Sequence, residues 1–202
     1  MEQWIERFSH YCADSGIITQ KDIPWFRYGL EKRIFTLVGA VPFFLLALFL
    51  TDISTAVPFF FSFYLLRRYA NGYHAKSMGV CFVQSLLFES VFLGLVGRFL
   101  NLPTALTVAT VSALLIAVLA PFNHPNMHLS DKEICACRVR SRFYAGCLLG
   151  CTYISAAVQK TNWVKGFALG IAMAAFLLCL AYFINGGNHN EHCTGKDQEC
   201  CH

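Results

Sequence analysis

The sequence predicts an all-α polytopic membrane protein, built as a bundle of transmembrane helices. Hydrophobic residues make up 56% of its 202 residues and charged residues only 14%, whereas a typical soluble domain is about 25% charged. Four long runs carry almost no charge: 34–50, 80–99, 104–120 and 164–184. Spanning a bilayer takes about 20 mostly apolar residues. Because lipid offers the backbone no hydrogen-bond partners, we expect these runs to be helices.

An amphipathic helix is predicted at the start of the chain, within residues 1–30. Its apolar side chains repeat at helical spacing, away from the charged residues: Trp4, Ile5, Phe8, Tyr11 and Cys12. This pattern suits a helix that lies in the headgroup region. It equally suits a helix packed on the protein's own surface. Pro24 is expected to end the pattern before the first membrane span.

About six spans are expected, near 34–50, from a tight turn at 52–55 to about 66, and near 80–100, 104–120, 143–158 and 164–184. The second is short and contains Pro58, so the first pair could instead be a re-entrant hairpin beside four full spans. Polar loops are expected at 67–77 and 121–142, and a turn at 161–162. Together 1–185 form one predicted membrane domain, followed by a polar tail at 186–202 that contains cysteine and histidine.

Lysine and arginine predict the orientation of the spans. The N-terminal segment, the two polar loops and the tail hold 13 of the 16, and the opposite side holds only Arg98, Lys160 and Lys165. Positive charge is retained in the cytoplasm. We therefore expect a multi-pass protein with both termini in the cytoplasm.

His74 and Cys81 place a base and a thiol at the mouth of an apolar segment. A cysteine nucleophile needs a neighbouring base to form its thiolate. A straight helix would separate the pair by about 10 Å along its axis, whereas proton transfer needs about 3 Å. Gly72 and Gly79 permit a turn that closes this distance. Cys81 would then lie in the first turn of the third span, where the helix dipole favours an anion.

Three further polar residues follow Cys81 on the same helical face. Gln84 and Ser85 lie three and four residues after it, and the Gln84 amide is a candidate donor to the oxygen of a tetrahedral intermediate. Glu89 lies well inside the span, where an acid is costly and usually faces a partner or water. We expect Glu89 to hydrogen-bond inside the bundle, or else to receive a basic group of a substrate.

The block around this pair resembles the accessory gene regulator B family of AgrB-like membrane endopeptidases in bacterial quorum sensing. The resemblance is carried by six residues of one pattern: Arg67, Arg68, Gly72, His74, Ala75 and Cys81. Two further stretches support it, Tyr-Gly-Leu-Glu at 28–31 and Ala-Pro-Phe-Asn-His-Pro-Asn at 120–126. It extends over about 1–185. One departure is Met127, where the family often has a lysine.

The resemblance implies a cysteine endopeptidase in the bacterial cytoplasmic membrane. Family members cut a small amphipathic propeptide (AgrD-like) near its C-terminus and help to close a thiolactone or lactone ring. Cys81 would be the nucleophile and His74 the general base. Arg67 and Gly72 occupy motif positions expected to matter for activity. A homodimer in contact with membrane lipid is also implied.

Other classes of protein are less consistent with the residues. No nucleic-acid module or phosphate-binding loop is apparent, and we expect no cofactor and no metal. The tail's histidines and cysteines have no standard zinc spacing. The main alternative is a non-enzymatic peptide transporter or exporter subunit, in which Glu89 would mark a path and Cys81 would be dispensable.

Overall fold

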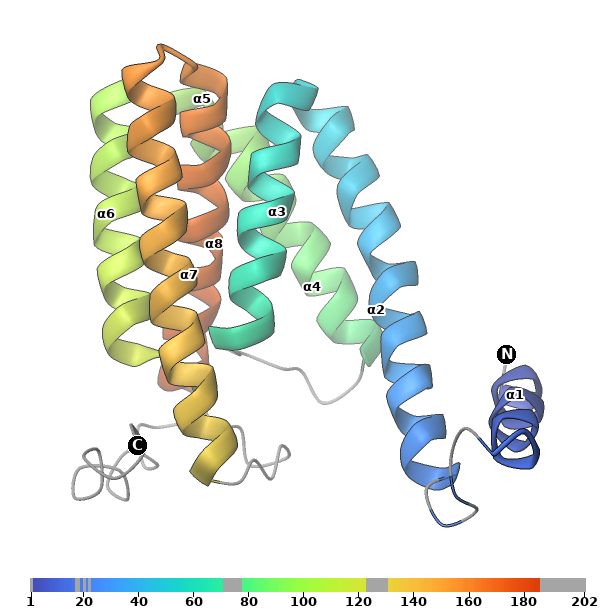
Figure 1. The fold of residues 1–202 in the computed structure, drawn as a ribbon. Coiled ribbons are helices and arrows are strands. Elements are labelled where there is room, and N and C mark those ends of the chain that lie inside the picture. Colours follow the sequence, from blue (N-terminus) through green and yellow to red (C-terminus); the bar gives the residue numbers. More distant parts are fainter. Residues whose placement is uncertain are drawn as a thin grey trace. The chain divides into compact units, whose positions relative to one another are not determined.

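A computed structural model describes residues 2–16, 19, 21, 23–70, 78–122 and 131–185 (Figure 1). Within these ranges every regular element is a helix and none is a strand, which confirms the predicted all-α class. The chain separates into two compact units, Met1–Phe43 and Phe44–His202, which are described in turn. Whether 1–185 functions as one domain stays a prediction.

The first unit contains α1 (Glu2–Asp14) and the start of α2 (Ile23–Leu50). α1 is amphipathic: Ile5 and Cys12 are buried, whereas Trp4 is 79% exposed. Phe8 stacks on Phe26 with 6.4 Å between ring centroids, and Glu6 pairs with Arg27 at 3.6 Å. One ring pair and one exposed ion pair thus join α1 to the first turns of α2.

The structure corrects the predicted start of the first long helix. We expected Pro24 to interrupt helical structure, with a span from residue 34. Instead α2 begins at Ile23, so that Pro24 is its second residue. Proline is tolerated in a first turn because the N–H groups there have no partner inside the helix. Pro42 also lies inside α2, and the helix continues to Leu50.

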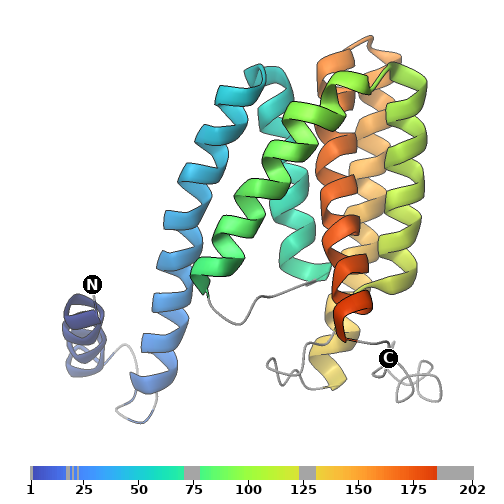
Figure 2. The ribbon, with the colours of Figure 1, turned by 180° about the vertical axis from the view of Figure 1, so that it is seen from behind.

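The second unit is a helical bundle centred on α8 (Thr161–Asn185). Around α8 lie α3 (Ile53–Ala70), α6 (Leu102–Leu119) and α7 (Asp131–Ala157) (Figure 2). A further rod consists of α4 (Met78–Ser90), the π-helix η2 (Val91–Val96) and α5 (Gly97–Phe99). In the apolar stretch of α8, 67% of the residues are buried, compared with 28% in that of α6 and 11% in that of the rod. α8 is therefore the core helix.

Two glycines allow α8 to approach α3 closely. A Cβ atom on Gly170 would meet the Ser62 hydroxyl and would lie 2.6 Å from the carbonyl oxygen of Phe59. On Gly166 it would meet the backbone of Thr55 and lie 2.6 Å from Cγ of Pro58. Small residues four apart are a common way for membrane helices to bring their backbones together. Van der Waals contact between α3 and α8 therefore depends on these two positions.

The bundle has two distinct ends. At the Ala70 end, the Phe122 N–H donates to the Ala70 carbonyl at 3.2 Å, and the Tyr182 hydroxyl donates to the Leu119 carbonyl at 2.8 Å. At the Asp52 end, the Asn162 amide donates to the Ser54 hydroxyl at 3.2 Å. α4 starts toward the Ala70 end, and α5 closes the rod at the Asp52 end (Figure 1).

Several loop boundaries were predicted wrongly. Arg67 and Arg68 belong to the last turn of α3, not to a loop. The expected loop at 121–142 is helical from Asp131 onward, since α7 starts there. The turn expected at 161–162 lies earlier, over residues 158–160, where Gln159 has a φ of 59°. The first turns of α7 were predicted as loop because they are polar and precede the apolar part of the helix.

Three described segments are long and apolar enough to cross a membrane: Phe82–Phe99, Leu102–Leu119 and Thr161–Ile184. A shorter apolar stretch, Val38–Leu50, lies in α2. These segments match the predicted first, third, fourth and sixth spans. The total of six spans and their orientation stay predictions.

Candidate active site

Cys81 is the fourth residue of α4, which begins at Met78. The predicted placement of its backbone near the start of a helix is confirmed, whereas Gly79, which we expected to permit a turn, is the second residue of α4. N–H groups of a first turn lack partners inside the helix and form the positive end of its dipole. His74 and Gly72 lie outside the described residues, as does the side chain of Cys81. The meeting of imidazole and thiol therefore stays a prediction.

Glu89 is fully buried in the last turn of α4. Neither of its carboxyl oxygens has a hydrogen-bond partner in the described part of the chain, so the expected hydrogen bond inside the bundle is not found there. Gln84, lower on the same helix, has a buried Oε1 atom that also lacks a donor there. Leaving a buried acceptor unpaired costs roughly 1–3 kcal/mol. The helix that carries Cys81 thus holds a buried carboxyl group and a buried amide oxygen that a hydrogen-bond donor would satisfy.

Aromatic rings on this rod hold it against α8. Phe176 of α8 contacts Phe88 edge-on at 5.2 Å between centroids and Phe92 at 5.7 Å. Phe88 immediately precedes Glu89, so this contact fixes the turn that carries the acid. Ser85, the remaining predicted residue of this face, is partly buried one turn earlier.

Arginine and tyrosine side chains gather where α3 ends beside α7. Tyr69 stacks on Tyr144 with 4.9 Å between centroids. The guanidinium carbons of Arg68 and Arg140 lie 5.7 and 5.9 Å from the centre of the Tyr69 ring. We call these four residues the Tyr69 cluster. Arg67, predicted to matter for activity, precedes it in the last turn of α3 and is half-buried.

Sequence reasoning missed the Tyr69 cluster, because it assigned Arg140 to a loop. Once α7 is seen to begin at Asp131, Arg140 becomes part of a helix that packs on α3. Another arginine of α7, Arg142, donates from Nε to the Ala117 carbonyl at 2.9 Å. The alternating basic residues at 138, 140 and 142 were the available signal in the sequence. Their positions beside α3 could be assigned only once these residues were known to lie in a helix.

Two stretches that carry the family resemblance meet at the Ala70 end. Ala120, Pro121 and Phe122 follow α6, and the Phe122 N–H bonds to Ala70, the last residue before the segment that holds His74. Phe122 is buried and contacts Tyr182 edge-on at 5.0 Å. The remainder of that stretch, 123–126, and Met127 lie outside the described residues, as does the tail at 186–202.

These features define an all-α protein with membrane-length helices and a cysteine at the start of one of them. The family model described as Accessory gene regulator B matches residues 5–178, and the chain belongs to that family. It is 28% identical over 185 residues to accessory gene regulator protein B of Staphylococcus aureus strain Newman, covering 89% of this chain and 94% of the relative. It is 22% identical over 195 residues to the protein of the same name from Staphylococcus epidermidis, covering 94% and 98%. No solved structure matches the chain. Membership places the chain in the accessory gene regulator quorum-sensing system.

Proposed function

We propose that this protein is a membrane cysteine endopeptidase that cuts a small AgrD-like propeptide and promotes closure of its ring. The observation that carries the proposal is the position of Cys81 in the first turn of α4, in a chain of the accessory gene regulator B family. Cys81 is the nucleophile, and His74 is the base that ionises it. A cytoplasmic location of the Ala70 end and a homodimeric assembly belong to the same proposal.

The proposed reaction is an acyl transfer in two steps. The Cys81 sulfur attacks the scissile carbonyl, and the amide C–N bond breaks as His74 returns its proton to the leaving amine. The N-terminal part of the propeptide is then held as a thioester. A cysteine thiol within that part attacks the thioester, releases Cys81 and closes a thiolactone; a serine hydroxyl would close a lactone. One thioester replaces another, so the thiolactone step needs no ATP.

The buried acceptors of α4 support a binding role for this helix. Gln84 and Glu89 would accept hydrogen bonds from N–H groups of a bound peptide, which would remove the cost of leaving them unpaired. The Gln84 amide would also donate to the developing oxyanion. A carboxyl group buried in a membrane helix equally favours the alternative of a peptide transporter, in which Glu89 lines the path.

Trapping the acyl-enzyme tests the proposal. A propeptide whose ring-forming cysteine is replaced by alanine can be cut but cannot cyclise, so the thioester on Cys81 should accumulate. Intact mass spectrometry should find the full chain heavier by the N-terminal fragment, and hydroxylamine should remove that mass. A Cys147→Ser/Cys151→Ser variant, which lacks two exposed thiols of α7, should form the same adduct. Attachment to any residue other than Cys81 would refute the assignment.

The Tyr69 cluster is proposed to hold an acidic segment of the propeptide, because it brings two guanidinium groups to the Ala70 end. Arg140→Gln should raise KM for an acidic peptide by about tenfold, the value of one charge-assisted hydrogen bond. KM for the same peptide with glutamine in place of its acids should change little. Lys160→Gln, at the other end of the bundle, is the control. Equal changes for both peptides would show that Arg140 only supports the fold.

A further inference from the structure

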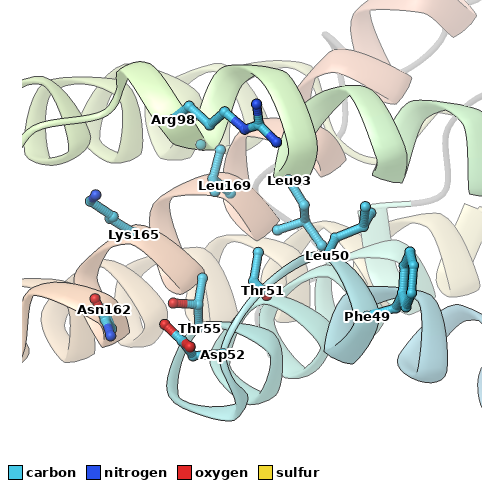
Figure 3. A pocket seen from close by; sticks show the side chains of 11 residues that line it. Phe49, Leu50, Thr51, Asp52, Thr55, Leu93, Arg98, Asn162, Lys165 and Leu169 are labelled. Atoms are coloured by element: carbon cyan, nitrogen blue, oxygen red, sulfur yellow. The ribbon is translucent and has the colours of Figure 1, made fainter.

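A pocket of about 490 Å³ opens at the Asp52 end, away from the start of α4. Four parts of the second unit line it: the end of α2, the first turn of α3, the end of the rod, and the first turns of α8 (Figure 3). Cavities that bind small molecules typically measure about 300–1,000 Å³. Nothing in the proposed peptidase reaction uses this pocket.

Two cations and one acid line the pocket without pairing. Arg98 projects from the rod, Lys165 from α8 and Asp52 from the turn before α3 (Figure 3). In the described part of the chain, none of the three forms an ion pair within 4.0 Å. Two neighbouring polar groups already form hydrogen bonds, since the Thr51 hydroxyl donates to the Ala47 carbonyl and the Asn162 amide to the Ser54 hydroxyl. The pocket therefore carries an excess of one positive charge and two uncommitted cationic donors.

The backbone of the rod is shaped to present Arg98 here. The π-helix η2 ends at Val96, directly before Gly97 and Arg98. π-helical turns are rare and are frequently found at functional sites. A Cβ atom on Gly97 would approach Cδ1 of Leu169 to 3.2 Å, so glycine allows the rod to pack closely on α8 at this level. Arg98 and Lys165 consequently face one cavity from two different helices.

Part of the pocket lining is apolar. Leu50, Leu93 and Leu169 form this part of the lining. Phe49, which also lines the pocket, is 86% exposed, and Phe99, next to Arg98, is 77% exposed. Both lie at the ends of apolar helices, where lipid chains would cover them. A ligand that combines an anionic headgroup with an apolar chain matches both the cationic and the apolar parts of the lining.

We propose that this pocket binds a phospholipid with an anionic headgroup, whose phosphate lies between Arg98 and Lys165. The Asp52 carboxylate accepts a hydrogen bond from a hydroxyl of the headgroup, and an acyl chain follows the apolar surface beside Phe49 and Phe99. In the proposed orientation this end faces outward, where positive residues are disfavoured. Two of the three lysines and arginines predicted on that side nevertheless line this one pocket.

The test measures thermal unfolding of the full chain in neutral detergent, because a ligand that binds only the folded state raises the melting temperature. Dioleoyl phosphatidylglycerol should stabilise the wild type more than dioleoyl phosphatidylcholine does. In Arg98→Gln/Lys165→Gln the apparent affinity for phosphatidylglycerol should fall by about a hundredfold, roughly tenfold for each lost cation.

Two matched variants separate a specific site from general surface charge. Lys160→Gln removes a cation at the same end but outside the pocket, and it should respond to phosphatidylglycerol as the wild type does. Arg98→Lys/Lys165→Arg keeps both charges and should retain most of the stabilisation. An unchanged response in the double glutamine variant overturns the proposal. So does full stabilisation by inorganic phosphate alone, which would identify a site for a free anion.

Discussion

Replacing Cys81 by alanine is expected to reduce propeptide cleavage by about a thousandfold or more, because the reaction loses its nucleophile. Cleavage is measured with the purified protein in lipid vesicles and a synthetic propeptide, by mass spectrometry of both fragments. Cys81→Ser is expected to be similarly inactive, since a hydroxyl at this position is a far weaker nucleophile than a thiolate.

The His74→Ala variant should lose activity to a similar extent, since thiolate formation depends on the imidazole. Residues that act as one unit have effects that do not add, so the double variant Cys81→Ala/His74→Ala should be about as inactive as either single variant. Circular dichroism should show that all three retain the helical content of the wild type. The Cys147→Ser/Cys151→Ser protein should cut normally.

Retained function in these variants would decide against the peptidase. Cleavage by Cys81→Ala at the wild-type rate would rule out covalent catalysis by this thiol. A second outcome would support the transporter alternative. In that case neither the wild type nor any variant cuts the peptide, yet vesicles containing Cys81→Ser still move it across the membrane. The two classes are therefore separated by the same set of proteins.

Gly170→Ala is expected to destabilise the fold by about 3 kcal/mol, at the upper end of the cost of overpacking. The added methyl group would meet Ser62 and the Phe59 carbonyl, and a backbone atom inside a helix cannot move aside as a flexible side chain can. For a chain of this length such a change lowers the melting temperature by roughly 10 °C. Thermal unfolding followed by circular dichroism in detergent measures it.

The control for this prediction is Gly150→Ala on α7. A Cβ atom there meets nothing within 4 Å, so the substitution should leave the melting temperature unchanged or raise it slightly. Gly166→Ala should resemble Gly170→Ala, because it faces Pro58 and the backbone of Thr55. A Gly170→Ala protein as stable as the wild type would contradict the close approach of α3 and α8.

Local patterns in the sequence were sufficient for much of the fold. Apolar runs placed helices over 80–99, 104–120 and 164–184, and the observed bounds differ from these by a few residues. Helix ends that consist of polar residues or proline were harder to predict. Pro24 at the start of α2 and the charged residues at the start of α7 both belong to helices, because first turns accept proline and charge.

The chemistry of the candidate site was predictable in part. Cys81 was assigned to the first turn of the third span, after a turn permitted by Gly72 and Gly79; it is the fourth residue of α4, and Gly79 is the second residue of that helix. Complete burial of Glu89, with no hydrogen-bond partner among the described residues, was not predictable, since burial depends on residues distant in sequence, as the packing of the adjacent Phe88 on Phe176 of α8 shows. The same reason hid the contact between Tyr69 and Arg140.

By itself, the sequence determined the class of this protein: apolar runs of membrane length require helices, and the block from Arg67 to Cys81 identifies the family to which it belongs. The tertiary structure alone decided which helix forms the core, how Gly166 and Gly170 bring α8 onto α3, and that Arg98 and Lys165 share a pocket. The physical reason is the sequence separation of the residues that interact. Helix formation depends on neighbours within a few residues, whereas packing depends on surfaces that only the folded chain brings together.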